Sequence, residues 1–263
     1  MIRALDVARI LFFYGLIGSI VLFSPLGPLP SYFLIIVLSL IFMLVSGIQI
    51  RPGNPAVGVI AATVAMISLF LIILAAGGFY INGLQPDFAN ALLWGALLQL
   101  FVATGEELSF RNYLFADLDK MAGRRAAAVV SSVGFAAMHL PSLYFLNAGP
   151  AEAIIALITI FIASIVMTVL FVKAGILAAI GFHFAWNFLQ YHVFGFSHMD
   201  AALEITKTGF TLLNGGIFGP EASVPGLIVV AGTLAAVWYY YSWKERRARG
   251  VEDQPQSSKD TKE

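Results

Sequence analysis

Long runs without a charged residue constrain this chain more than any other feature of its sequence. Seven such runs lack Asp, Glu, Lys and Arg: 10–50, 52–86, 88–105, 126–151, 153–172, 174–199 and 222–243. A helix that crosses about 30 Å of hydrocarbon needs about 20 apolar residues, and the runs are about that long or longer. Membrane-spanning β-strands would be about 10 residues long with alternating polarity. The sequence therefore predicts an all-α polytopic membrane protein.

Composition indicates the same class of protein. Of the 263 residues, 59% are hydrophobic and 11% are charged. Soluble domains have about 45–50% apolar and about 25% charged residues. A soluble domain, a nucleic-acid-binding protein and a disordered chain are therefore excluded, and membrane lipid is the expected environment. The formal net charge is zero, so the net charge does not indicate any particular class of partner. The absence of cysteine excludes disulfides, thiolate metal sites and a thiol nucleophile.

Proline and glycine at the joints divide the chain into about eight expected spans. The first span follows Arg3 and Arg9, as the apolar part of a signal peptide would. No small-x-small cleavage site precedes Pro25, so we expect a retained helix. The spans are expected at about 8–24, 31–50, 56–79, 88–105 and onward, 126–140, 152–172, 174–194 and 223–243.

The distribution of Lys and Arg over the joints predicts the orientation of the spans. With the N-terminus in the cytoplasm, every cytoplasmic joint is basic. The basic residues of these joints are Arg51, Lys120, Arg124, Arg125, Lys173, Lys244, Arg246, Arg247 and Arg249. The opposite joints at 25–30, 80–87, 141–151 and 195–222 contain one basic residue, Lys207. We therefore expect a multi-pass protein of the cell membrane with both termini in the cytoplasm.

A cluster of charges lies inside the fourth expected span, where an ionisable group is costly and is by default a candidate for function. Glu107 and Arg111 are four residues apart, so they share a helix face and can pair. Glu106 lies about 100° around the helix, which leaves its carboxylate available for chemistry. The alternative is a cytoplasmic loop, in which such charges are tolerated.

Two histidines and an asparagine are the other polar candidates within spans. His183 and Asn187 are four residues apart and lie on one helix face; a hydrogen bond that packs two helices is their alternative role. His139 lies near the end of its span, and a structural role is its alternative.

These polar candidates fall at one depth in the membrane. Glu106 and His139 each lie 14 residues, roughly 20 Å of helix, from the basic end of their span. His183 lies ten residues, roughly 15 Å, from the basic end of its own span. We therefore expect a water-filled chamber within the helix bundle, open to the cytoplasm, and lined by Glu106, His139, His183 and Asn187.

The expected chamber suits the hydrolysis of a peptide bond by an activated water. Glu106 and His139 can take a proton from water, and His183 and Asn187 can donate hydrogen bonds to a developing oxyanion. Glu106, His139 and His183 are also a plausible three-ligand zinc site with an open position. A metal-bound water and a glutamate-activated water are therefore both open.

Three motifs along the chain resemble those of the CPBP family, which comprises the type II CAAX prenyl endopeptidases and the bacterial bacteriocin-processing and Abi proteins. The motifs are Glu-Glu-x-x-x-Arg at 106–111, Phe-x-x-x-His at 135–139 and His-x-x-x-Asn at 183–187. The resemblance covers roughly 94–190, and the glycine-rich stretch 214–221 is similar to a loop of bacterial members. The roles that it implies are water activation by Glu106 and His139, an oxyanion site at His183 and Asn187, and orientation of the site by Glu107 and Arg111.

The resemblance implies an intramembrane endopeptidase that acts on a peptide or a lipidated peptide. The family is often labelled as metalloproteases, and a metal-free glutamate mechanism is also proposed for it, so Zn²⁺ is one alternative and no metal is the other. Two other functions are kept open by the residues. One is a proton-coupled transporter, because Glu and His inside a bundle also form proton relays; the other is a non-proteolytic membrane scaffold or immunity protein.

The domain boundaries and the roles of the remaining polar residues follow from the same reasoning. Gln99 is expected to make a packing hydrogen bond rather than to line the chamber, and His192 and His198 are expected in solvent. The expected domains are three N-terminal helices (1–87), the catalytic core helices (88–194), the glycine-rich loop with the last helix (195–243) and a disordered cytoplasmic tail (244–263).

Overall fold

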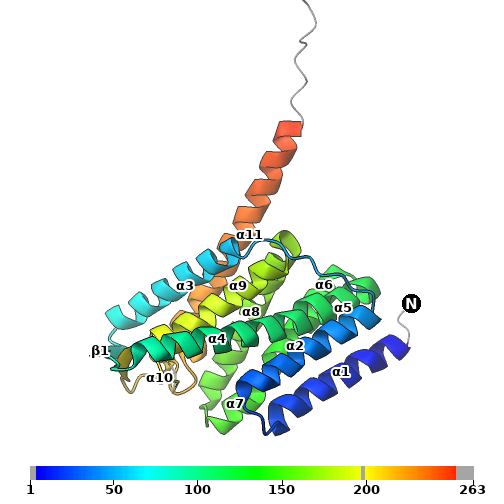
Figure 1. Ribbon diagram of the computed structural model, residues 1–263. Helices are drawn as coiled ribbons and strands as arrows, with labels where there is room; N and C mark the ends of the chain where they lie inside the picture. Colours follow the sequence, from blue (N-terminus) through cyan, green and yellow to red (C-terminus); the bar gives the residue numbers. More distant parts are fainter. Residues whose placement is uncertain (1–3, 197–198, 253–263) are drawn as a thin grey trace, which may run out of the picture.

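The computed structural model describes residues 4–196 and 199–252, which form a bundle of helices with one small sheet (Figure 1). Helices satisfy every backbone hydrogen bond within one segment, which is what an apolar segment in lipid requires. The long helices are α1 (Ala4–Phe23), α2 (Pro28–Val45), α3 (Ala56–Ala75), α4 (Phe88–Glu107), α6 (Arg124–Ala137), α8 (Pro150–Ala174), α9 (Ile176–Phe188) and α11 (Val224–Glu252). The short ones are α5 (Ala116–Ala122), α7 (Leu140–Phe145), α10 (Thr211–Asn214) and the 3-10 turn η3 (Pro220–Ala222).

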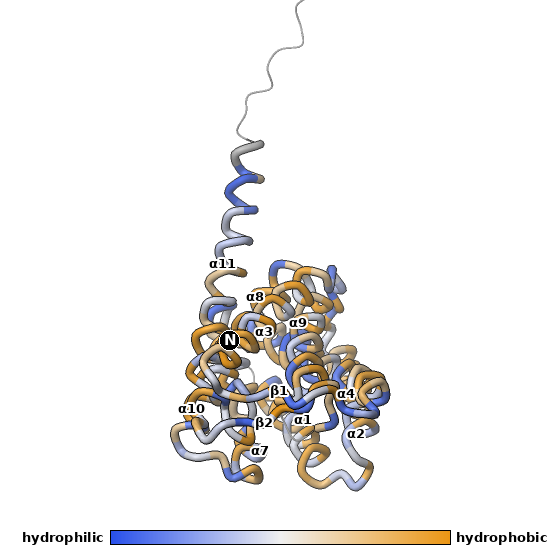
Figure 2. The backbone as a smooth tube through the Cα atoms, turned by 90° about the vertical axis from the view of Figure 1, so that its left-hand side faces the viewer, coloured by the Kyte–Doolittle hydropathy of each residue, from blue (hydrophilic) through white to orange (hydrophobic). Residues whose placement is uncertain are grey.

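Among the described residues, seven helical segments are long and apolar enough to cross a membrane. They are α1, α2, α3, α4 through α5, α6 through α7, α8 and α11. The other expected span, 174–194, corresponds to α9, which has 13 residues, and to the π-helix η2 (Leu189–Val193) that continues it. The chain is an all-α polytopic membrane protein, as the charge-free runs predicted. Figure 2 shows hydrophobic residues over much of the bundle and hydrophilic residues along the far end of α11.

The last helix continues beyond the expected end of its span. α11 runs to Glu252, so the tail boundary expected at 244 falls inside a helix. Lys173 at the end of α8 pairs with Glu245 on this extension. The remainder of the expected tail, 253–263, lies outside the described residues.

The fourth span is continuous but changes its helical type. A π-helix, η1 (Leu108–Phe115), joins α4 to α5 without a break, and all eight of its residues are buried. The hydroxyl of Ser109 donates to the carbonyl of Gly105 in this region. π-Helical turns are rare and are frequent at functional sites. The continuity from α4 to α5 is what the expected depth of Glu106 requires.

Helix α9 lies at the centre of the bundle and packs closely against α3. A Cβ atom at Gly58 of α3 would lie 1.9 Å from the carbonyl oxygen of Ala178 on α9. Small residues allow membrane helices to approach each other in this way. The contact fixes the helix that carries His183 and Asn187.

One two-stranded antiparallel sheet joins two connections that are far apart in the sequence. β1 (Phe79–Leu84) follows α3, and β2 (Leu203–Lys207) follows η2. Neither strand was expected from the sequence. The ammonium of Lys207 donates to the carbonyls of Phe196 and Gly216, each at 2.5 Å, and burial lowers the pKa of Lys207 to about 8.

Candidate active site

A cavity of about 280 Å³ inside the bundle, called the chamber below, brings the predicted polar residues together. Glu106 comes from α4, His139 from the joint between α6 and α7, and His183 and Asn187 from α9. Glu107 and Arg111, each 0% exposed, lie behind the chamber wall. Three separate segments of the sequence therefore supply one site: 106–111, 135–139 and 183–187.

Glu107 holds the ring of His183 from behind. Its Oε1 accepts a hydrogen bond from Arg111 Nη1 at 3.0 Å and lies 2.9 Å from His183 Nδ1. An ionised carboxylate only accepts, so His183 Nδ1 carries the proton and Nε2 is left for the chamber. Arg111 also donates to Ser164 Oγ at 2.9 Å, and its guanidinium lies 4.3 Å from the ring centre of Phe135. The buried charge of Glu107 is therefore balanced within the protein.

Glu106 is oriented by a hydrogen bond on one oxygen and faces a histidine with the other. Tyr32 of α2 donates to its Oε1 at 2.8 Å. Its Oε2 lies 3.8 Å from His183 Nε2, which is too long for a direct hydrogen bond and suits a water that bonds to both. His139 is held through Nδ1, 2.9 Å from the carbonyl oxygen of Phe135. The Nε2 atom of His139 is thereby left for the chamber.

A chain of hydrogen bonds supports Asn187. Its Nδ2 donates to Gln99 Oε1 at 3.2 Å, and Gln99 Nε2 lies 3.1 Å from His192 Nε2. His192 Nδ1 lies 2.9 Å from the carbonyl oxygen of Asp200. A carbonyl only accepts, so Nδ1 carries the proton and Nε2 accepts from Gln99. One amide hydrogen of Asn187 is used in this chain, and the second is left for the chamber.

The structure differs from the sequence-based expectation at Gln99 and His192. Gln99 makes a hydrogen bond between helices, as expected, but it also lines the chamber. His192 was expected in solvent and is 5% exposed. The reason is that the segment after η2 folds back over it, so that the amide of Ala202 donates to the carbonyl of His192 at 2.8 Å. His198 lies outside the described residues.

Several polar residues of the chamber were missed in the sequence, among them Tyr32 and Glu221. Tyr32 lies 74 residues from Glu106, so no spacing rule connects them. Glu221 Oε1 accepts from the indole of Trp186 at 2.8 Å, and Glu221 lines the chamber. The glycine-rich stretch 214–221 was the one signal that could have drawn attention to Glu221.

The residues do not fit the three-ligand zinc site considered above. In the described part of the chain, no three His, Asp or Glu side chains are arranged so that they could hold a metal ion. Glu106, His139 and His183 line the same chamber, but they do not converge on one point. We therefore derive no step through a metal.

The chamber lies toward the joints that are poor in basic residues. Its lining includes Pro28, Ser142 and Phe218, which belong to those joints, and no residue of the basic joints. In Figure 1, α7 and α10 lie at the lower left, away from the N-terminus at the right. With the orientation that the Lys and Arg residues predict, these joints lie opposite the cytoplasm.

Comparison with protein families assigns the core of the chain. Residues 88–189 match the family model described as type II CAAX prenyl endopeptidase Rce1-like. The chain carries an Rce1-like domain. The Rce1-like domain begins with α4 and contains all six predicted site residues, whereas Tyr32 and Glu221 lie outside it. No curated protein matches the chain. The match to the Rce1-like family supports the assignment of the chain as a CAAX-type intramembrane protease.

Proposed function

We propose that the chain is an intramembrane endopeptidase that hydrolyses a peptide bond in a CAAX-type or related peptide. The observation that carries the proposal is the carboxylate of Glu106, held by Tyr32 at 2.8 Å and facing His183 at 3.8 Å. Both groups line a chamber of about 280 Å³ within a membrane bundle. The match of residues 88–189 to the type II CAAX prenyl endopeptidases supports the reaction class.

In this proposal a water that bonds to Glu106 Oε2 attacks the carbonyl carbon of the substrate. Glu106 takes a proton from the water as the new bond between oxygen and carbon forms, and His139 is the second group that activates the water. The carbonyl oxygen becomes an oxyanion, which accepts from Asn187 Nδ2. His183 adds a donor when its Nε2 is protonated. The carbon–nitrogen bond then breaks, and Glu106 returns its proton to the leaving amine.

Cleavage of a quenched fluorescent peptide by the purified protein in detergent tests the proposal. One probe ends in a farnesylated CAAX sequence, and its partner is the same peptide without the lipid. Glu106→Gln and His139→Ala are each expected to lower kcat by at least about 100-fold, the usual contribution of a general acid or base. Glu245→Gln makes the same chemical change as Glu106→Gln on the exposed end of α11. This variant is the control and is expected to keep its activity.

The outcomes separate the alternatives. Wild-type rates in both chamber variants, with unchanged thermal unfolding, contradict the site assignment. Cleavage of neither peptide by the wild-type protein contradicts the peptidase on these probes and favours a transporter or a scaffold. Cleavage of the farnesylated peptide alone identifies a lipidated substrate.

We further propose that both termini lie in the cytoplasm and that the chamber opens on the opposite face of the cell membrane. The basic joints support this orientation. The chain has no cysteine, so single cysteines can be labelled without background. In intact cells, a membrane-impermeant maleimide is expected to label Ser142→Cys and to label Arg124→Cys only after permeabilisation. The reverse pattern contradicts this orientation.

A further inference from the structure

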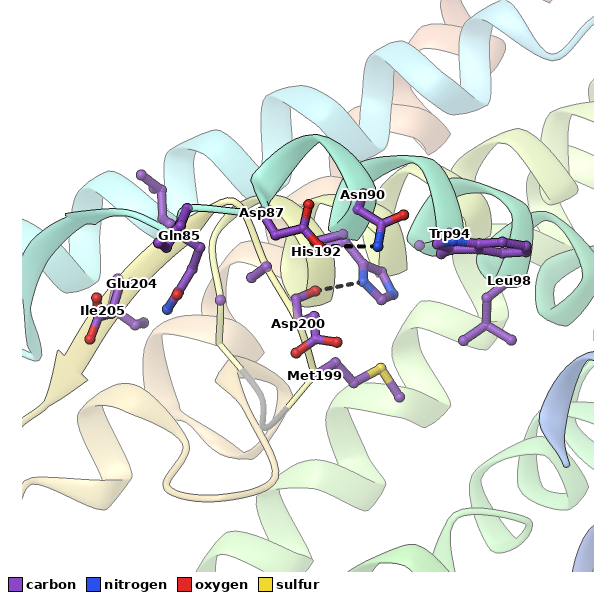
Figure 3. A pocket seen from close by; sticks show the side chains of 16 residues that line it. Gln85, Asp87, Asn90, Trp94, Leu98, His192, Met199, Asp200, Glu204 and Ile205 are labelled. Carbon is purple, nitrogen blue, oxygen red and sulfur yellow. Dashed lines mark hydrogen bonds between the residues drawn. The ribbon is translucent and has the colours of Figure 1, made fainter.

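A second and larger cavity adjoins the chamber. It is an open groove of about 930 Å³, shown in Figure 3, between the start of α4 and the residues 192–195 and 199–205. Pockets that enclose ligands commonly have roughly 300–1,000 Å³. Leu98 and Met199 line both the groove and the chamber. The two cavities are therefore neighbours with a shared wall.

The groove is lined by carboxylates, and no Lys or Arg among the described residues lies beside them. Asp87, Asp200 and Glu204 are exposed in it, and its lining among the described residues includes no Lys or Arg. Asp87 accepts a hydrogen bond from Asn90 at 3.1 Å. No ion pair between these three carboxylates and a Lys or Arg is found in the described part of the chain. Trp94, 60% exposed, adds an aromatic face, which attracts cations as well.

The rest of this face does not neutralise the groove. Its joints contain one basic residue, Lys207. The ammonium of Lys207 is occupied by the carbonyls of Phe196 and Gly216. A single metal ion is a poor occupant, because the described side chains include no group of three that could hold one. The exposed carboxylates instead come from two separate segments, Asp87 before α4 and Asp200 with Glu204 after η2, which suits several separate cations on one peptide.

The floor of the groove is built on the same hydrogen-bonded chain as the chamber. A Cβ atom at Gly95 would lie 2.2 Å from Cγ of His192, so glycine is what lets this ring lie against α4. The other side of the ring bonds to Gln99, which bonds to Asn187. The same chain of hydrogen bonds therefore holds His192 at the floor of the groove and the amide of Asn187 in the chamber.

We propose that the groove binds a basic stretch of the peptide substrate several residues from the scissile bond. The inference rests on the proposed peptidase function, because a peptide chain held at Glu106 must continue out of a chamber of about 280 Å³. Leu98 precedes Glu106 by eight residues and Asp87 precedes it by 19, which is roughly 12 Å and 28 Å along the helix. With about 3.3 Å per extended residue, Lys or Arg is expected roughly four to eight residues from the scissile bond.

Binding can be measured without catalysis. The probe is a fluorescein-labelled peptide that contains four lysines, and its partner has four glutamines in their place. Fluorescence anisotropy with the full chain carrying Glu106→Gln, in detergent, gives the Kd of each peptide. We expect the lysine peptide to bind roughly tenfold more tightly, the effect of several exposed ion pairs together, and added salt to reduce this preference.

Two double variants localise the effect. Asp87→Asn with Glu204→Gln removes two carboxylates from the groove and is expected to reduce the preference to about twofold. Asp119→Asn with Glu245→Gln removes two carboxylates at the basic end of the bundle and is expected to keep the tenfold preference. The proposal is overturned by a lysine peptide that binds no better than the glutamine peptide. It is equally overturned if the groove double variant keeps its preference for the lysine peptide. Equal loss of this preference in both double variants also overturns it.

Cleavage of the same two peptides by the unmodified protein, each extended by a farnesylated CAAX sequence, separates this inference from the proposed function. Faster cleavage of the lysine peptide supports both. Lysine-dependent binding without cleavage supports the groove and counts against the peptidase. Equal cleavage of both peptides supports the peptidase and overturns the groove.

Discussion

The chamber and the groove differ in how their charges are balanced. Behind the chamber wall, Glu107 is 0% exposed and its carboxylate is paired with Arg111 at 3.0 Å. In the groove, Asp87 and Glu204 are exposed to solvent. A buried charge without a partner destabilises a fold, because the lost hydration is not replaced. An exposed carboxylate keeps its hydration and can exchange water for a ligand. The chamber is therefore organised before the substrate arrives, whereas the groove is completed by its occupant.

Arg111→Met gives the largest expected effect on this comparison. The substitution leaves the buried carboxylate of Glu107 without its cation, so we expect the free energy of unfolding to fall by about 3–5 kcal/mol. Thermal unfolding in detergent measures this loss. A second substitution, Glu107→Gln, is expected to restore part of the stability, because it removes the unpaired charge.

Asp87→Asn in the groove is the matched control for this experiment. An exposed substitution of this kind is expected to change the free energy of unfolding by less than about 0.5 kcal/mol. Equal losses in Arg111→Met and Asp87→Asn would break the distinction between the two cavities.

Tyr32→Phe gives a smaller effect that sharpens the description of the chamber. It removes the 2.8 Å hydrogen bond to Glu106 and leaves the ring in place. Because a hydrogen bond to a charged group contributes about 1.5–3 kcal/mol, we expect kcat to fall by about tenfold or more while KM changes little. Steady-state kinetics on the farnesylated peptide measures both constants.

The matched control is Tyr14→Phe. Tyr14 donates to the backbone carbonyl of Ser109 at 2.9 Å, and it does not line the chamber. This variant is expected to keep its kcat. If the two phenylalanine variants lose stability and activity alike, Tyr32 is structural and does not position Glu106.

The parts of the fold that depend on local spacing could be predicted from the sequence. The charge-free runs predicted the helices, because apolar length is a property of each segment alone. The pair of Glu107 with Arg111 followed from a separation of four residues on one helix. Those residues also lie within the Rce1-like domain, where the three motifs occur.

The parts that depend on contacts between distant segments could not be predicted. The hydrogen bond from Tyr32 to Glu106 connects two spans, and a tyrosine in an apolar run does not stand out. His192 was expected in solvent because it follows the seventh span, but the segment after η2 covers it. The side toward which the chamber lies could not be predicted either, because depth along each helix does not say toward which end the helices separate.

The sheet formed by β1 and β2 has a consequence for the behaviour of the protein in different lipids. β1 leads into Gln85 on one wall of the groove. The amide of Gln85 donates at 2.9 Å to the carbonyl of Ala202, which lies in sequence between Ala201 and Leu203 of the other wall. Backbone hydrogen bonds therefore connect the two walls of the groove. A change in bilayer thickness is accommodated by helix tilt, and the sheet makes the two walls tilt together. The groove is therefore expected to keep its shape in thin and thick membranes alike.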